Sequence, residues 1–179
     1  MTAELISVGT ELLMGNIVNS NTRFLAEKCA LLGFDMYYQV TVGDNYGRMK
    51  DVIETALKRS DLIILTGGLG PTEDDLTKEV CAAVMGMELV EDPHTRKHLE
   101  AFFVNNIYRE IPENNWKMAT VPKGALVLDN HNGMAPGLIL EREGKAAILL
   151  PGPPGELYPM FNDQVFPWLQ KRQQSVLVS

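Results

Sequence analysis

Short apolar segments alternate with amphipathic helical patterns along the first half of the chain. Leu62 to Leu65 is apolar throughout, as expected of a strand that is buried on both faces. Tyr46 to Arg59 instead places its apolar residues at the spacing of one helical face. In chain order, strand-like and helical segments are predicted at 5–9, 21–32, 36–42, 46–59, 62–66 and 76–84. Such alternation favours an α/β fold.

The predicted architecture is a mainly parallel sheet that helices cover on both faces. Parallel strands need long crossover connections, and helices in those connections cover the sheet. In sheets of this kind ligands bind beyond the carboxyl ends of the strands, near the point where the strand order reverses. The segments after the first three strands contain Gly9, Gly43 and Gly67. We therefore expect these segments to meet at one edge of the sheet and to form the ligand site.

The second half of the chain is less regular. Asp92-Pro93 provides an N-cap and a first-turn proline for a helix predicted at 94–107, and a short helix is predicted at 113–118. Val176 to Val178 is predicted to begin a β-like run. Three further strands are predicted at 125–128, 137–141 and 146–150. We expect one domain over residues 1–179, in which a tail from about residue 171 leads to a domain absent from this chain.

The most informative segment follows the third predicted strand and reads Thr66-Gly67-Gly68-Leu69-Gly70-Pro71-Thr72-Glu73-Asp74-Asp75-Leu76-Thr77. Glycines at a strand-to-helix turn expose backbone N–H groups that can bind an anion. A tight turn without a ligand is the alternative, because neither the dinucleotide fingerprint nor the lysine of a P-loop is present. The candidate phosphate- or nucleotide-binding residues are Gly67, Gly68, Leu69, Gly70 and Thr77.

Three adjacent carboxylates, Glu73, Asp74 and Asp75, are predicted to open the helical pattern that follows, and they would repel such an anion unless a cation lies between them. Acidic residues in a first helical turn also stabilise the helix dipole, by about 0.3–1 kcal/mol each. Stabilisation of the helix dipole accounts for one or two carboxylates at this place, whereas three adjacent carboxylates repel one another. Mg²⁺ in proteins accepts one or two carboxylates together with phosphate oxygens and water. We therefore expect a divalent metal at Asp74 and Asp75, with Glu73 facing solvent.

Other polar residues are predicted at the same edge of the sheet. Asp44 follows the second strand and is a further candidate metal ligand, with capping of the next helix as the alternative. Asn19 and Ser20 precede the first helix, where they either cap it or contact a ribose or a heterocycle. Gly152 and Pro153 lie in a proline-rich loop. Its stiffness suits either a plain connector or a binding site that presents backbone groups at little entropic cost.

Composition and charge disfavour several classes of function. The net charge is −7 and no Lys/Arg-rich run is present, which disfavours nucleic-acid binding. No apolar run approaches the length of a membrane span, and the N-terminus has no signal-peptide pattern. Cys29 and Cys81 lie among apolar residues at helical spacing, which predicts buried free thiols in a reducing compartment. We therefore expect a cytoplasmic protein.

The motifs that carry a family resemblance occur in a fixed order along the chain. They are Val8-Gly9-Thr10-Glu11-Leu12-Leu13-x-Gly15, Asn19-Ser20-Asn21, Val42-Gly43-Asp44-Asn45, the 66–77 segment, Gly133-x-Ala135-Pro136-Gly137 and Leu150-Pro151-Gly152-Pro153-Pro154-x-Glu156-Leu157. Through them, essentially the whole chain resembles the N-terminal domain of the CinA family of competence/damage-inducible proteins. That domain belongs to the molybdopterin-binding superfamily of MoaB, MogA and gephyrin. The resemblance implies a three-layer α/β/α fold with a mainly parallel sheet of the MogA/MoaB-like type.

The resemblance also implies activities and partners. In the MogA-like branch the matching glycine loop binds pterin phosphate or nucleotide, and aspartates that match Asp75 and Asp44 serve adenylyl transfer. In CinA proteins the same domain is associated with metal-dependent pyrophosphatase action on ADP-ribose. Superfamily members are commonly oligomeric, so a homo-oligomer is expected. A C-terminal domain of the nicotinamide mononucleotide deamidase type usually follows in the family, and its activity is not assigned to this chain.

The loop departs from the MogA pattern at two places. Leu69 replaces a Thr, and Glu73-Asp74 replaces a Pro-Arg pair. The loss of a basic residue and the gain of carboxylates favour pyrophosphate cleavage, with Asp75 and Asp44 as catalytic residues and Mg, Mn or Co as the metal. A molybdopterin-binding or adenylyl-transferring module is the first alternative. A non-catalytic nucleotide-binding or assembly domain is the second.

Overall fold

The computed structural model describes residues 1–105 and 110–178. Within these ranges, six strands form one sheet in the order β2-β1-β3-β8-β7-β6. The pairs β2–β1, β1–β3 and β3–β8 are parallel, whereas β8–β7 and β7–β6 are antiparallel. The strands are β1 (Ala3–Val8), β2 (Gln39–Val42), β3 (Leu62–Thr66), β6 (Leu126–Leu128), β7 (Gly137–Arg142) and β8 (Lys145–Leu150). The prediction of an α/β fold with a mainly parallel sheet is confirmed.

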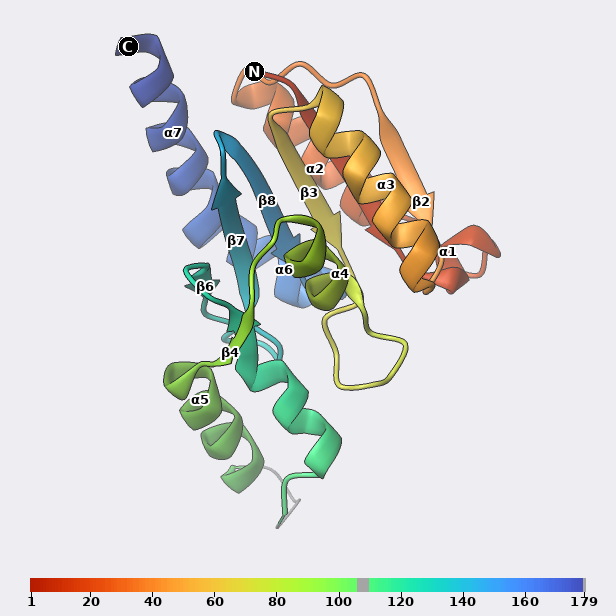
Figure 1. The fold of residues 1–179 in the computed structure, drawn as a ribbon, viewed down its shortest axis with the longest axis vertical. Coiled ribbons are helices and arrows are strands. Elements are labelled where there is room, and N and C mark those ends of the chain that lie inside the picture. The colour runs from red at the N-terminus through yellow and green to blue at the C-terminus, as the bar shows by residue number, and fades with distance from the viewer. Residues whose placement is uncertain (106–109, 179) are drawn as a thin grey trace.

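Helices cover both faces of the sheet, so the three-layer arrangement is confirmed as well. Figure 1 shows α3 and α4 in front of the strands and α2 behind them. Buried side chains place α6 and α7 on the same face as α2. The helices are α2 (Ser20–Leu31), α3 (Tyr46–Arg59), α4 (Thr77–Val84), α6 (Pro154–Met160), the π-helical turn η2 (Phe161–Val165) and α7 (Phe166–Val178). No helix in the described ranges is long and apolar enough to span a bilayer.

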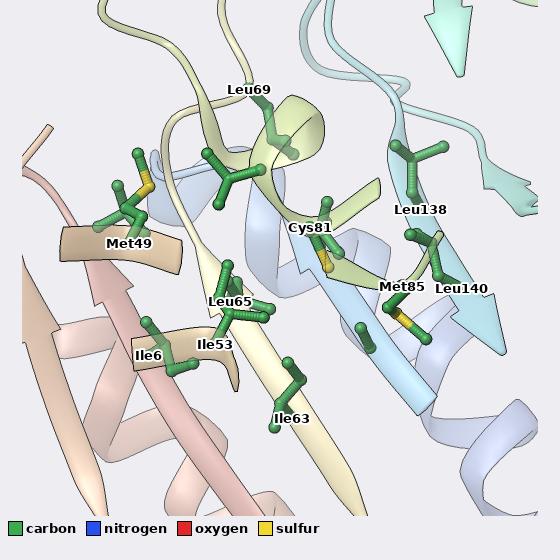
Figure 2. Close-up of a cluster of buried hydrophobic side chains, with 14 of the residues drawn as sticks. Ile6, Met49, Ile53, Ile63, Leu65, Leu69, Cys81, Met85, Leu138 and Leu140 are labelled. Carbon is green, nitrogen blue, oxygen red and sulfur yellow. The ribbon is translucent and has the colours of Figure 1, made fainter. Parts of the chain in front are cut away.

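The central strands are apolar on both sides because each side faces a helical layer. In β3, Ile63 and Leu65 pack with α3 and α4, as Figure 2 shows, whereas Leu62 and Ile64 pack against the other layer. Cys81 of α4 lies in the first cluster. Burial raises the pKa of the Cys81 thiol to about 12 and has the same effect on Cys29. Both cysteines are free and buried, as predicted.

A small lobe follows α4 and lies at the carboxyl end of the parallel strands (Figure 1). It consists of β4 (Leu89–Glu91), α5 (Pro93–Val104), the 3₁₀ helix η1 (Glu113–Ala119) and β5 (Thr120–Pro122). The predicted cap of α5 is confirmed, because the Asp92 carboxylate accepts a hydrogen bond from the N–H of Thr95 at 3.0 Å. The predicted end of this helix at residue 107 lies outside the described residues. The antiparallel pair β4–β5 was not predicted, since three-residue strands are too short to show a periodic pattern.

Three local predictions are wrong. The strand predicted at 36–42 begins only at Gln39, where pairing with β1 begins. The acidic residues 73–75 do not open a helix: α4 starts at Thr77, and they lie in the preceding loop. Val176 to Val178 continue α7 and form no strand. The helix propagates through the two valines because its earlier turns are already anchored, by buried Leu169 and by a 2.5 Å hydrogen bond from Arg172 to Glu141.

An unpredicted ion pair links the interior strand β1 to the end of α3. Glu4 in β1 is fully buried, and its carboxylate accepts hydrogen bonds from Arg59 Nη2 at 2.6 Å and Nε at 3.1 Å. The hydroxyl of Ser60 donates a further bond at 3.0 Å. The two donors at the end of α3, Arg59 and Ser60, therefore compensate the cost of burying the Glu4 carboxylate.

We expect Arg59→Met to lower the free energy of unfolding clearly more than the loss of a surface ion pair does, because it leaves the buried Glu4 carboxylate without its counter-charge. Arg23→Met is the matched control. Arg23 pairs with Glu27 on the surface, where the side chains are 85% and 63% exposed, and its loss should cost less than about 1 kcal/mol. Urea denaturation followed by circular dichroism measures both values, and equal effects would contradict the importance of the buried pair.

Candidate functional site

The loops that follow β1, β3 and β8 meet in one pocket of about 760 Å³ at the carboxyl end of the sheet. The strand order reverses between β1 and β3, which is where parallel sheets bind ligands. One predicted site residue, Thr77, does not line this pocket. The others line the pocket: Asn19, Ser20, Asp44, Gly67, Gly68, Leu69, Gly70, Asp74, Asp75, Gly152 and Pro153.

Gly67 and Gly68 form a tight turn directly after β3. Their φ angles are +89° and +70°, in the left-handed region that glycine adopts without strain. Neither position has room for a side chain. A Cβ atom would lie 2.5 Å from the carbonyl oxygen of Val8 at Gly67, and 2.1 Å from Thr77 Oγ1 at Gly68. The turn therefore requires both glycines.

The N–H groups of this loop are not all available to a ligand. Gly67 N–H donates to the carbonyl oxygen of Leu150 at 3.0 Å and thus extends the pairing of β3 with β8. This corrects the expectation that residues 67–70 all offer donors. Across the described ranges, the N–H groups of Gly68, Leu69 and Gly70 donate to no protein acceptor. These three donors belong to residues that line the pocket and form the candidate anion site.

Thr77 lies beneath the loop and is fully buried. Its hydroxyl donates to Gly67 O at 2.8 Å, and its N–H donates to Gly68 O at 3.2 Å. The structure therefore places Thr77 where it fixes the glycine turn against the first residue of α4, away from the pocket where a phosphate contact was predicted.

Carboxylates from the segments that follow β1, β2, β3 and β8 line the pocket: Glu11, Asp44, Asp74, Asp75 and Glu156. Of the described residues that line it, none is Lys, Arg or His. Asp75 Oδ2 accepts hydrogen bonds from Thr72 N at 2.9 Å and Thr72 Oγ1 at 2.7 Å. Asp44 Oδ2 accepts two longer bonds from Thr10, N and Oγ1, both at 3.3 Å. The pocket thus joins backbone donors to a strongly acidic wall.

The donor chemistry of this wall fits a divalent metal ion bound together with phosphate oxygens of a ligand. Carboxylate oxygens are the hard ligands that Mg²⁺ prefers. Asn45, whose side chain accepts from Arg48 N at 3.0 Å, caps α3, so Asp44 is not needed as the cap. Within residues 1–105 and 110–178, no group of three or more acidic, His or Cys side chains is arranged to hold a metal by itself. The protein would therefore supply one or two carboxylates to each ion, and phosphate oxygens and water would complete the shell.

The polar residues at the start of α2 connect this helix to the proline-rich loop. Asn19 caps α2 by accepting from Thr22 N at 3.4 Å, and it donates to Ser7 Oγ at 2.8 Å, so the capping alternative is correct for its side chain. Asn21 Nδ2 donates to the carbonyl oxygen of Gly152 at 2.7 Å. Asn21 Oδ1 is buried and has no hydrogen-bond partner among the described residues. Asn21 thereby links the loop after β8 to the start of α2.

Sequence analysis missed the apolar side chains that the lobe brings to the pocket. Phe102 of α5 and Met118 of η1 line it, together with Met134 from the loop before β7. Phe102 also makes an edge-to-face contact with Phe103, with ring centroids 5.9 Å apart. No local motif marks Phe102 or Met118, because both reach the pocket only through the position of the lobe.

We expect Gly68→Ala to weaken binding of magnesium pyrophosphate at least about tenfold, since the new Cβ would clash with Thr77 Oγ1 and displace the donors. Gly155→Ala is the matched control, because no atom lies within 4 Å of a Cβ built there. Isothermal calorimetry on both folded variants gives the comparison. Parent-like affinity in Gly68→Ala would rule out this loop as the anion site.

Comparison with known proteins agrees with the fold. A sequence model of the family described as "Probable molybdopterin binding domain" matches residues 4–171. A relative from Caldicellulosiruptor bescii named "Putative competence-damage inducible protein" is 53% identical over 179 residues, which are 100% of this chain and 43% of that protein. The chain therefore spans less than half the length of the curated relatives it matches.

Two solved structures have a similar fold. The protein CinA of Thermoplasma acidophilum, described as having unknown function, superposes with a TM-score of 0.84 at 32% identity, covering 90% of this chain and 95% of that one. MoaB of Thermus thermophilus superposes with a TM-score of 0.59 at 16% identity, covering 95% and 96%, and is similar in fold alone. The chain therefore belongs to the CinA family, and residues 4–171 make up its molybdopterin-binding-type domain.

Proposed function

We propose that the protein is a metal-dependent nucleotide pyrophosphatase that acts on ADP-ribose or a similar ADP-containing pyrophosphate. The make-up of the pocket carries this proposal. Free N–H groups of residues 68–70 lie beside carboxylates, and no basic side chain is present among the described residues of its wall. Asp44, Asp74 and Asp75 would repel a bare phosphate ester. A pyrophosphate that arrives with a divalent cation satisfies both the donors and the carboxylates.

The residues of the chain would bind and orient the pyrophosphate. The N–H groups of residues 68–70 donate to non-bridging oxygens and stabilise the charge that develops as the bond breaks. Asp75 and Asp44, the proposed catalytic residues, would hold one or two divalent ions with Asp74. When bound, such an ion supplies charge neutralisation and a water of lowered pKa. Water oxygen bonds to one phosphorus, the bridging P–O bond breaks, and ADP-ribose yields AMP and ribose 5-phosphate.

The size and the walls of the pocket support a dinucleotide-like substrate. Its volume of about 760 Å³ lies within the usual range for small-molecule sites. Phe102, Met118 and Met134 offer an apolar surface that suits the face of an adenine ring. Ser20, at the start of α2, provides an exposed hydroxyl in the same pocket for a ribose.

We expect Asp75→Asn to lower kcat/KM for ADP-ribose at least about a hundredfold, because it removes a carboxylate charge at the proposed metal. Glu73→Gln is the matched control. Glu73 is exposed and lies outside the pocket, so its loss should leave the rate within about twofold. Release of AMP is measured with Mg²⁺, Mn²⁺ and Co²⁺ in turn. Parent-like hydrolysis by Asp75→Asn would refute the assignment of this residue.

Molybdopterin binding or adenylyl transfer is the second candidate, and the description of the matching family favours it. Glu73-Asp74 stand in place of the Pro-Arg pair of MogA-like loops. The loop therefore lacks a basic residue and gains two carboxylates, which disfavours adenylyl transfer. If the pyrophosphatase proposal is correct, calorimetry with molybdopterin should show no tight binding, and ATP should yield no adenylylated pterin. Submicromolar pterin affinity without hydrolysis of any dinucleotide would favour the second candidate.

A non-catalytic nucleotide-binding or assembly role remains the third candidate, because the relatives of this chain are more than twice its length. Turnover of any dinucleotide by the purified chain would exclude it. Binding of ADP-ribose with no turnover under any of the three metals would support it.

A further inference from the structure

A lysine from the lobe holds the backbone of the acidic loop. Lys117 in η1 donates a hydrogen bond from Nζ to the carbonyl oxygen of Thr72 at 2.7 Å, and a second, short one to that of Asp75. Its Nζ also lies 3.9 Å from Glu79 Oε1. The side chain is only 25% exposed, so the ammonium group exchanges much of its hydration for these carbonyl groups.

Asp75 is contacted on two different sides. Its carboxylate lines the pocket and lies against Gly70, where a Cβ would come within 2.8 Å of Oδ2. Its backbone closes the turn, because its N–H donates to Thr72 O at 3.2 Å, and its carbonyl oxygen accepts from Lys117. Lys117 itself does not line the pocket. The lysine thus constrains where the carboxylate lies without occupying the place of a ligand.

The lysine is in turn anchored on α4. Lys78 Nζ donates to the carbonyl oxygen of Lys117 at 2.6 Å and lies 3.3 Å from Thr120 Oγ1. Glu79 lies 3.8 Å from Lys78 and 3.9 Å from Lys117, between the two ammonium groups. α4 packs on the sheet. These contacts therefore fix Lys117 of η1, and through it the backbone of Asp75, relative to the hydrophobic core.

The negative charge of the acidic loop explains why a cationic side chain is needed beside its backbone. Three consecutive carboxylates, Glu73, Asp74 and Asp75, share this loop, and mutual repulsion would otherwise open it in the absence of a metal. The pocket wall supplies no basic side chain within the described ranges, so the compensating charge comes from behind the loop. Lys117 is placed to provide it, since both of its backbone contacts are within the turn.

We propose that Lys117 is a positioning residue of the candidate site: its ammonium group holds the Thr72–Asp75 turn so that the Asp75 carboxylate is presented to a divalent metal ion. The inference rests on the proposed function, because it assigns a purpose to the proposed metal ligand Asp75. Lys117 acts through the backbone of Asp75 and makes no contact with the substrate.

The test compares Lys117→Met, Lys117→Arg and Lys123→Met in the purified chain. Met keeps all but the last atom of the length of the side chain and removes its charge, whereas Arg keeps the charge. Lys123, an exposed lysine in the turn after β5, is the matched control. Calorimetry with Mn²⁺ alone measures metal affinity, and amide hydrogen exchange of residues 70–76 reports the order of the loop.

For Lys117→Met we expect the Mn²⁺ dissociation constant to rise about 10–100-fold, as when a group that orients a metal ligand is lost. Exchange at residues 70–76 should accelerate while exchange in β1 and β3 stays unchanged. Lys117→Arg should recover most of the Mn²⁺ affinity, and Lys123→Met should match the parent. Parent-like affinity and exchange in folded Lys117→Met would overturn the proposal, as would an equal loss in Lys117→Arg.

Two further outcomes separate this inference from the proposed function. If Lys117→Met does not fold, Lys117→Arg decides: retained Mn²⁺ affinity supports the positioning role, and its loss overturns it. If the parent chain binds Mn²⁺ but hydrolyses no nucleotide, the proposed function fails and the role of Lys117 stands. If the parent binds no Mn²⁺ in the absence of phosphate, the ion enters only together with the pyrophosphate, as the proposed function allows, and exchange at residues 70–76 then decides the role of Lys117.

Discussion

The pairing of β3 between β1 and β8 is the constraint on which the site depends. In the parallel ladders, Leu65 is aligned with Ile6 on one side and with Leu149 on the other. All three strands therefore end at the same edge of the sheet. The Gly67 N–H extends the β3–β8 ladder by one bond to Leu150 O and so fixes the start of the loop. A slip of one residue would exchange the two buried faces, which the apolar strands would not tolerate without repacking both layers.

Electrostatics gives this edge its chemical character. The chain carries a net charge of −7, and five of its carboxylates line a single pocket. The positive charges near the loop, Lys78 and Lys117, lie behind it and contact backbone and side-chain oxygens of the protein. Burial lowers the pKa of Lys78 to about 8, an effect that Lys117 increases and Glu79 opposes. The arrangement leaves the front of the loop acidic, which suits a ligand that arrives with its own cation.

Several parts of the fold could be predicted because their signals are local. The limits of β3 and α3 follow from an apolar run and an amphipathic period, and both match the structure residue for residue. The acidic residues 73–75 were misplaced into a helix, since their composition resembles a first helical turn as much as a loop. The residues that line the pocket from the lobe, such as Phe102, carry no local signal. Their contribution depends on contacts between distant segments.

Local sequence alone predicts the alternation of strands and helices, the glycine turn after the third strand, and the excess of acid after that turn. These are properties of neighbouring residues: periodicity, backbone freedom and charge density. Only the tertiary structure decided which N–H groups stay free, that Thr77 lies beneath the loop, and that Lys117 holds it from behind. Such assignments depend on which hydrogen bonds the packed segments satisfy. Those partners are separated by up to 83 residues, as between Gly67 and Leu150, so no local pattern encodes them.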